Sequence, residues 1–545
     1  MIRLLRTVLT LRPRQVTGRL VFWFRWRRAL SAAVALAPGA SETAAPWPAG
    51  FPPGPEPDLA DPGALTLLND PRRVGWPPGW LAPDMPLLWR FRLHGLEWIA
   101  RLPAELRPEV AREWVAGNQP RPGPAWHPHP TSRRIAALLR WGLGSDPVVA
   151  SSLQLQAAFL HRCVERHVMG NHLLDNARAL VLAGLVFRDV PEAHAWLANG
   201  LGIYRAELPS QILPDGGHEE RSPMYHALVL EGLADCIHAL AATGEAAEDR
   251  AFLEGYARRM AGALAAWCLP DGEIPLLNDS AFGVAPHPAL LLRWVEEACG
   301  DLPDGGNHFP STGIFVHRGP RLHLVWDAGP GGPRHLMAHA HADVFSFELA
   351  VDGVRFVVDP GVSTYEVGAE RDFLRSTPAH ATVSIDGGDQ FECWHAFRVA
   401  RRAEPREVGW EARLGQSAFR GVYPWGAIHG DRLLHRREIV VDDGLQQVRI
   451  VDQVTGNGTH MVEAVFPLAP GVEVRLLGQS AELECEGVRV EFRTQGGRLR
   501  MEDRWVAPEF GLRVPSRVLV LWRKGAVPVE FDSCLRVLSR RGVAS

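Results

Sequence analysis

The spacing of apolar residues changes near residue 300, and this change restricts the chain to a two-part architecture. Between about residues 88 and 300, runs such as SRRIAALLRWGL and DRAFLEGYARRMAGALAAWCL place apolar residues three and four positions apart, which is typical of helices. After DLPDGG, short runs such as RLHLVWDAG and REIVVDDG alternate apolar and polar residues between Gly-containing turns, which is typical of antiparallel strands. A chain of 545 residues can give each part its own core.

The helical runs are separated by short Gly, Pro and Asp breaks, which indicates a solenoid or toroid of helical hairpins. The strand runs predict an antiparallel β-sandwich. Residues 38–86 are rich in Pro and Gly and predict an irregular connecting arm. We therefore divide the chain into a basic N-terminal segment with its arm at 1–87, a helical domain at 88–305 and a β domain at 306–545.

The first residues, MIRLLRTVLTLRPRQVTGRLVFWFRWRRALSAAVALAPG, are basic and contain a short apolar run from Ala29 to Ala37. Two interpretations stay open: a late secretion signal, or an Arg-rich amphipathic helix that lies on the helical domain or on a membrane surface. The length of the basic region favours the helix. No run in the chain reaches the length of a transmembrane helix.

A histidine and carboxylate cluster opens the segment HAHADVFSFELAVDGVRFVVDPG, where His339, His341 and Asp343 alternate. On a strand, residues two apart share a face, so these three would point the same way, with Asp359 joining from a neighbouring strand and His380 from a later one. Imidazole and carboxylate ligands suit Zn²⁺, and the seven dispersed cysteines offer no CxxC spacing for a thiolate site. The alternative is a set of half-buried histidines bonded to backbone; the density of the cluster favours a functional site.

Two motifs in the helical half also carry polar side chains suited to a cleft. In GNHLLDN, Asn171 and His172 stand at the start of a helix, where Asn either caps the helix or faces an anion. In GGHEERSPMYH, a polar loop with Glu220 precedes Tyr225 at the next helix start, where Tyr225 either faces a cleft or packs between helices.

The charge balance excludes one class of partner. The formal net charge is −4 and charged residues make up 22%, so the chain lacks the basic field that nucleic-acid binding favours. Local arginines would have to hold an anionic substrate: Arg371, Arg375 and Arg398 flank the histidine cluster, although pairing with nearby carboxylates is the usual state of such residues. Trp394 could serve as a platform for a sugar ring or as core.

The segment HAHAD…SFEL…VVDPG…RSTPAHATVSIDGGDQ…W…FR resembles the C-terminal signature of the heparinase II/III family of polysaccharide lyases. GNHLLDN and ERSPMYH resemble the pieces of the family's helical domain that face the sheet, so the resemblance spans both halves. In one departure, the family has Asn after the histidine of RSTPAH, whereas this chain has Ala381 and therefore lacks any contact of that amide.

The resemblance implies an incomplete (α/α) toroid followed by an antiparallel β-sandwich, with the active site in the cleft between them. It implies that Asn171 neutralises a uronate carboxylate, that Tyr225 is the catalytic acid/base and that His339 is the partner base. It also implies a metal site, with Zn²⁺ in a structural role, formed by His341, Asp359 and His380. The expected activity is cleavage of a uronic-acid-containing acidic polysaccharide by β-elimination.

Further residues are expected to bind the substrate: His172, Glu220, Arg371, Arg375, Trp394 and Arg398. A glycosidase is less favoured, because no pair of carboxylates has a separation that the sequence fixes. A second hypothesis is a non-catalytic glycan-binding or polysaccharide-assembly protein with the same fold. The resemblance implies the periplasm or cell envelope, a cytoplasmic location stays open because no clear signal peptide is seen, and the sequence leaves the oligomeric state open.

Overall fold

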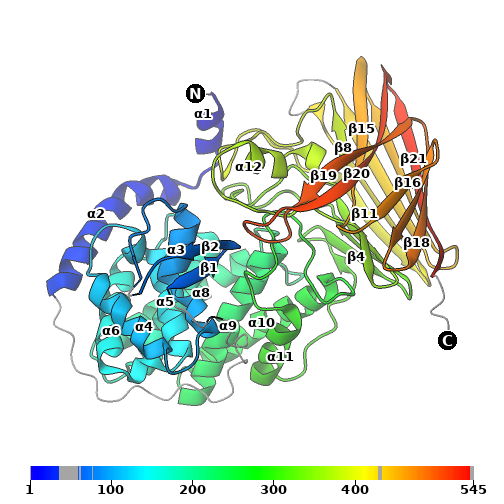
Figure 1. The fold of residues 1–545 in the computed structure, drawn as a ribbon. Coiled ribbons are helices and arrows are strands. Elements are labelled where there is room, and N and C mark those ends of the chain that lie inside the picture. The colour runs from blue at the N-terminus through cyan, green and yellow to red at the C-terminus, as the bar shows by residue number, and fades with distance from the viewer. Residues whose placement is uncertain (1, 36–58, 60–62, 77, 427–431, 541–545) are drawn as a thin grey trace.

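The computed structural model describes residues 2–35, 59, 63–76, 78–426 and 432–540. Helices fill the first half and strands the second, and Figure 1 shows the two regions side by side, with the sheets of the second region stacked as layers. This arrangement confirms the predicted toroid and β-sandwich. Among the described residues, no helix is both apolar enough and long enough to cross a membrane.

The helical region is built from consecutive hairpins of helices. Its elements are α3 (Leu87–Gly95), α4 (Arg107–Gly117), α5 (Pro128–Arg140), α6 (Pro147–Arg162), α7 (Gly170–Val186), α8 (Ala193–Gln211), α9 (Pro223–Thr243), α10 (Ala247–Trp267) and α11 (Pro288–Cys299), with short 3₁₀ turns η1 (Glu97–Arg101), η2 (Pro124–Trp126) and η3 (Leu143–Ser145) between them. Two helices precede this region: α1 (Ile2–Val8) and α2 (Pro13–Ala35).

The β region contains three larger antiparallel sheets. The first sheet packs nearest the helices and consists of β3 (His308–Phe309), β4 (Ile314–Arg318), β5 (Leu322–Asp327), β6 (Phe347–Val351) and β7 (Val354–Val357), in that order. The second sheet has the order β11 (Arg406–Arg413), β12 (Gln416–Tyr423), β13 (Leu434–Asp442), β14 (Gln447–Thr455), β21 (Val529–Arg540), β18 (Val488–Gln495), β17 (Ser480–Cys485) and β16 (Glu473–Leu476). The third has the order β19 (Arg498–Val506), β20 (Val514–Ala526), β15 (Thr459–Pro467) and β8 (Val383–Ile385).

Smaller elements surround this core. The connection between β7 and β8 contains α12 (Ala369–Leu374) and the turn η4 (Thr377–Ala379), and it is followed by the two-stranded ribbon of β9 (Cys393–Trp394) and β10 (Arg398–Val399). Most of the Pro/Gly-rich arm lies outside the described residues; its described end forms a short hairpin of β1 (Ala64–Leu67) and β2 (Asp70–Arg73). The predicted boundaries of the three segments stay a prediction.

Packing joins the two halves into one body. Ala263, Ala266 and Trp267 of α10 are buried together with Phe309 and Val316 of the first sheet. Removing apolar surface from water at this contact stabilises the association of the two halves. The loops between the last helices and the first sheet are thereby held against the loops that lead into β6.

Candidate functional site

The start of α9 places Tyr225 on the first turn of that helix. Pro223 occupies an early helical position, where its missing N–H costs nothing, and the Ser222 side chain accepts a hydrogen bond from the Tyr225 N–H at 3.2 Å. The Ser222 hydroxyl also donates to the Asp279 carbonyl at 2.7 Å. The cap of this helix is thus tied to the loop that carries Asp279.

The start of α7 places Asn171 beside the buried carboxylate of Glu220. The backbone N–H of Asn171 donates to Glu220 Oε1 at 2.9 Å, and its side-chain Nδ2 donates to Glu220 Oε2 at 2.8 Å. The preceding residue is Gly170 at φ +55°, where a Cβ would lie 2.0 Å from Glu220 Oε1. Asn171 is therefore not the N-cap of the helix; the anion at this helix terminus is the Glu220 carboxylate, and a glycine leaves room for it.

His339 joins these two helix starts. Its imidazole stacks on the Tyr225 ring with centroids 3.9 Å apart and an interplanar angle of 29°. Its Nε2 lies 3.3 Å from Glu220 Oε2, and its Nδ1 lies 3.0 Å from Asp279 Oδ2. Glu220 thus bridges Asn171 and His339, which brings all three predicted catalytic residues into one constellation.

Tyr365 completes the surroundings of Tyr225. The two hydroxyl oxygens are 2.9 Å apart, and Tyr365 comes from the loop after β7. Burial raises the pKa of Tyr225, the Asp279 carboxylate raises that pKa further, and the hydrogen bond from Tyr365 opposes both effects. Tyr225 therefore stays protonated over the ordinary pH range and is a potential proton donor.

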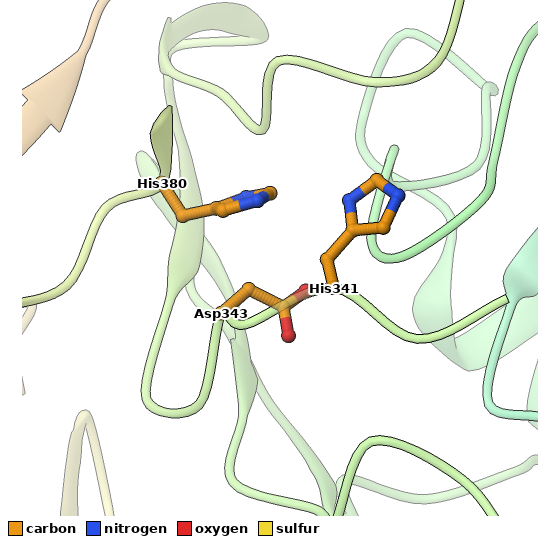
Figure 2. Close-up of side chains that lie close together, drawn as sticks. All are labelled: His341, Asp343 and His380. Carbon is orange, nitrogen blue, oxygen red and sulfur yellow. The ribbon is translucent and has the colours of Figure 1, made fainter. Parts of the chain in front are cut away.

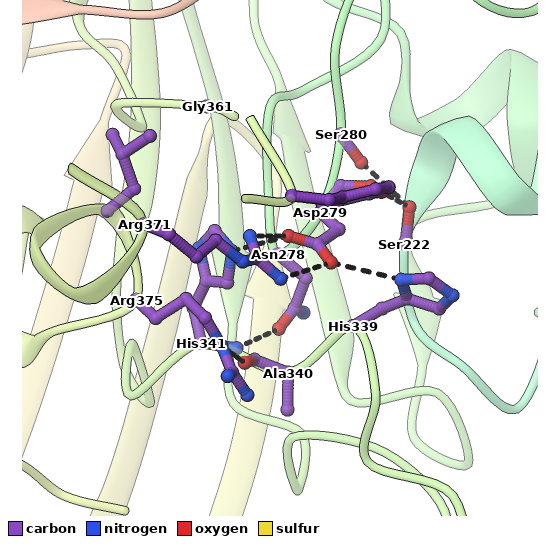
Figure 3. Close-up of polar contacts among 12 residues, drawn as sticks. Ser222, Asn278, Asp279, Ser280, His339, Ala340, His341, Gly361, Arg371 and Arg375 are labelled. Carbon is purple, nitrogen blue, oxygen red and sulfur yellow. Dashed lines mark hydrogen bonds and ion pairs between the residues drawn. The ribbon is translucent and has the colours of Figure 1, made fainter. Parts of the chain in front are cut away.

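Asp279 is the fully buried centre of the polar network (Figure 3). Its carboxylate accepts hydrogen bonds from both terminal nitrogens of Arg371, and the bond from Nη2 is 2.7 Å long. The same carboxylate lies 2.9 Å from His341 Nε2, in addition to its contact with His339. Burial alone would raise the pKa of Asp279, but the Arg371 charge and the hydrogen bonds from His339, His341 and Arg371 together hold that pKa well below its usual range. The sequence reasoning missed Asp279; the only signal was the polar triplet Asn-Asp-Ser inside the apolar run IPLLNDSAF.

The segment HAHAD is a loop before β6 and not the predicted strand. Its backbone bonds to other loops: the His341 N–H donates to Asn278 Oδ1 at 3.0 Å, and the His339 carbonyl accepts from the Asp279 N–H at 3.1 Å. The three alternating residues therefore do not share one face. His339 faces the two helix starts, whereas His341 and Asp343 take part in a separate cluster with His380.

This second cluster could hold a metal ion. The side chains of His341, Asp343 and His380 point toward one another (Figure 2). All three are buried, and their ligand atoms lie within 4.8 Å of one another. His341 Nδ1 and Asp343 Oδ2 are buried without a hydrogen-bond partner among the described residues. Two unpaired buried acceptors in one cluster are costly without a cation or proton near them, so the donor set fits an ion that takes nitrogen and oxygen ligands.

Asp359, which was predicted as a ligand, lies at the edge of this cluster. Its Oδ2 is 2.8 Å from His380 Nδ1, while His380 Nε2 donates to the Leu374 carbonyl at 3.0 Å. Burial would lower the pKa of His380, but the Asp359 carboxylate, the Asp343 carboxylate and the Leu374 carbonyl together raise the pKa to about 9. An ion that replaced the proton between His380 and Asp359 would have both as ligands, together with Asp343, which the predicted ligand set omitted.

A cavity of about 70 Å³ opens beside the catalytic constellation. Its lining includes Asn171, His172, Tyr225 and Tyr365. A second cavity of about 630 Å³ continues from it through the helical domain. The two share several lining residues, namely Arg92, Glu97, Arg133, Val284 and Phe510.

Several predicted substrate-binding residues have other surroundings. Arg371 and Arg375 are fully buried; Arg375 donates to the carbonyls of Ala340 and His395, both at 3.0 Å. Both guanidinium groups form hydrogen bonds inside the protein. This corrects the expectation that the two arginines contact a substrate directly. Glu220 is likewise buried and positions Asn171 and His339.

The ribbon of β9 and β10 carries two more of these residues. Trp394 donates from Nε1 to Thr7 Oγ1 at 3.1 Å, and the Arg398 guanidinium lies 4.7 Å from the centre of the Trp394 ring. This pair therefore packs against the N-terminal segment, away from the cavity. Of the predicted substrate-binding residues, His172 is the one that lines the cavity, where its ring stacks on His129.

Comparisons with known proteins find matches in both halves of the chain. Residues 148–287 match the family model described as heparinase II/III N-terminus, and residues 302–533 match the model described as heparinase II/III-like, C-terminal. A solved structure titled as that of heparinase III superposes with a TM-score of 0.71 at 19% sequence identity, covering 86% of this chain and 81% of the other.

Two curated relatives of this chain carry the names of different kinds of protein. A heparin-sulfate lyase of Pedobacter heparinus is 26% identical over 248 residues, which cover 40% of this chain and 36% of the relative. An FtsZ-localized protein C of Caulobacter vibrioides is 25% identical over 358 residues, which cover 62% of this chain and 59% of the relative. The matched region thus spans about a third of the length of the lyase and under two thirds of the other protein.

Proposed function

This chain belongs to the heparinase II/III family, and on that premise we propose that it is a polysaccharide lyase that cleaves a uronic-acid-containing glycan by β-elimination. One observation carries the proposal: an amide from α7, a phenol from α9 and an imidazole from the loop before β6 come together beside a cavity that the amide and the phenol line, with Glu220 bridging the amide and the imidazole. These are the groups that the elimination needs.

The chemistry divides between the three side chains. Asn171 binds the uronate carboxylate and stabilises the charge that spreads onto it as the C5 proton leaves. His339 removes that proton, the electron pair forms the C4–C5 double bond, and the bond from C4 to the glycosidic oxygen breaks. Tyr225, whose pKa is raised by burial, donates its proton to the departing oxygen. No water is consumed, and the product carries an unsaturated uronate.

Positive charge for an acidic polymer comes from the wall of the cavity. Arg92 and Arg133 line it together with Asn171 and Tyr225. Arg133 pairs with Asp175 and Glu97. Arg92 also pairs with Glu97, with its Nη1 3.1 Å from Glu97 Oε2, and its side chain is more exposed than that of Arg133. We assign the first contact with the polymer to Arg92 because its guanidinium can reorganise at a lower cost.

A Zn²⁺ ion is proposed as a structural partner of this site. His341, Asp343, His380 and Asp359 would hold it, and the bound ion would supply a positive charge that fixes the orientation of the two histidines. Since His341 also contacts Asp279, which contacts His339, this anchoring would reach the catalytic constellation.

A second candidate function is a glycan-binding or polysaccharide-assembly protein without turnover. The observation that favours it is the FtsZ-localized protein C of Caulobacter vibrioides, which matches a larger share of this chain than the lyase does. In addition, both ring nitrogens of His339 face carboxylates, so the base must exchange a partner before it can take a proton.

The experiment that separates the two candidates compares wild-type protein with Tyr225→Phe and Tyr256→Phe on a panel of uronate-containing glycans. The lyase predicts a rise in the ultraviolet absorbance of the unsaturated uronate for wild type and for the Tyr256→Phe control, whose altered ring lies on α10 against Phe252. Tyr225→Phe should lose this rise and still bind the glycan. Binding without any absorbance rise in wild type supports the second candidate; turnover that survives in Tyr225→Phe contradicts the assigned proton donor.

A further inference from the structure

The helix α2 presents apolar side chains on two separate faces. One face, with Phe22, Trp26, Ala29, Leu30 and Ala33, packs on the helical domain, chiefly on α6. The other face points away from the protein and carries Leu20 and Phe24, which are 71% and 75% exposed, beside Val16 and Trp23. A helix that is apolar on both sides is expected to be covered on both sides.

Arginines flank the outward ridge formed by Val16, Leu20, Trp23 and Phe24. The helix contains five arginines and no acidic residue, and Arg19, Arg25, Arg27 and Arg28 are all exposed. The Arg27 guanidinium lies 4.4 Å from the centre of the Trp23 ring, so aromatic and cationic groups occur side by side. Helical spacing at 100° per residue places Arg27 within the ridge and Arg19 and Arg28 on its two flanks. Arg25 lies away from the ridge and lines a neighbouring cavity.

A cavity of about 310 Å³ lies between α2 and the segment that leads into α7. Arg14, Arg25 and Arg166 line it, and Glu207, the acidic member of the lining, lies 3.4 Å from Arg14. Its volume and its excess of basic groups suit a phosphate-bearing headgroup.

The preceding helix α1 also exposes apolar side chains. Leu5 and Leu9 are 59% and 74% exposed, and Ile2 and Leu4 are exposed as well. Figure 1 shows α2 running along the outer edge of the helical domain, where no sheet or helix of the described chain covers it. The apolar and basic surface is therefore accessible from outside the molecule.

We propose that the outward face of α2 binds the surface of an anionic membrane, with Leu20 and Phe24 inserted among the acyl chains and the arginines at the level of the headgroups. Aromatic and aliphatic residues flanked by arginines are the composition of helices that lie in the membrane interface. Charge disfavours a second copy of the chain as the occupant, because a symmetric contact would bring two arginine-rich helices together. A nucleic acid would leave the apolar ridge exposed to water.

The test is co-sedimentation of the full chain with vesicles of phosphatidylcholine alone or of phosphatidylcholine mixed with phosphatidylglycerol. The wild type should partition onto the anionic vesicles at least about tenfold better than onto the neutral ones, and salt should weaken this binding. The double substitution Leu20→Glu with Phe24→Glu should lower the partition at least about tenfold.

The matched control substitutes two exposed leucines of the β region, Leu414→Glu with Leu445→Glu, and should bind vesicles as wild type does. Circular dichroism and melting curves establish that each variant is folded. Equal binding to both kinds of vesicle, or undiminished binding by the α2 variant, overturns the proposal. So does a wild type that is dimeric in sedimentation velocity and becomes monomeric in the α2 variant, because the ridge would then be a self-interface.

Discussion

The Tyr365 hydroxyl lies 2.9 Å from the Tyr225 hydroxyl, and each comes from a different half of the molecule. This hydrogen bond lowers the pKa of Tyr225 against the effects of burial and of Asp279, which raise it. Tyr365 therefore makes Tyr225 a better proton donor than burial alone would allow.

Tyr365→Phe should lower kcat about tenfold and change KM by less than about twofold, because a donor of higher pKa transfers its proton less readily to the departing oxygen. Initial rates on a cleaved glycan give both constants. Because the donor stays protonated, kcat of the wild type should not fall on the alkaline side up to about pH 9. A fall in that range would assign the proton donor to a group of lower pKa.

The fold was largely predictable, because the period of the apolar residues reports which face of a helix or strand is buried. The helix starts at Pro223 and Gly170 follow local rules of capping and backbone freedom, so Tyr225 and Asn171 could be placed at the starts of helices. These rules depend on neighbours in the sequence.

The polar network was much less predictable, because its partners are distant in the sequence. Asp279 gains its role only from Arg371 and the two histidines, and nothing within a few residues of it indicates them. The alternation of HAHAD matches a strand, yet the backbone of this segment bonds to Asn278 and to other loops. Arg371 and Arg375 were assigned to a substrate from their charge, whereas burial of their guanidinium groups depends on the tertiary packing.

Removal of the Asp279 charge should destabilise the protein strongly. In Asp279→Asn the buried Arg371 loses its carboxylate partner, and we expect the free energy of unfolding to fall by about 3–5 kcal/mol. Urea denaturation measures this change. Asp503→Asn, at the exposed end of a surface ion pair with Arg517, is the control and should change it by less than about 1 kcal/mol.

A double substitution tests whether the loss of stability comes from the unpaired charge of Arg371. Arg371→Met combined with Asp279→Asn should recover part of the lost stability, since no unpaired charge is then left in the interior. Strictly additive losses would show that the two residues do not depend on each other.

Zinc content should depend on Asp343. Elemental analysis of dialysed wild type should give about one zinc per chain, and treatment with a strong chelator should lower the melting temperature, because an ion that binds only the folded state stabilises it. Asp343→Asn should lose the zinc, whereas Asp372→Asn on the exposed side of α12 should retain it. Equal zinc in both variants would place the ion elsewhere.

Arg92 should be the arginine that binds the polymer. It lines the cavity with Asn171 and Tyr225, whereas Arg398 lies on the Trp394 ring against the N-terminal segment. Arg92→Ala should raise KM, or the dissociation constant in a binding assay, about tenfold with little change in kcat, since a charge-assisted contact is lost equally from the bound and transition states. Binding should also depend less on salt, because one ionic contact fewer remains to be screened. Arg398→Ala is the matched control and should behave as wild type; if it weakens binding while Arg92→Ala does not, the glycan approaches over the β9–β10 ribbon instead of through the helical domain.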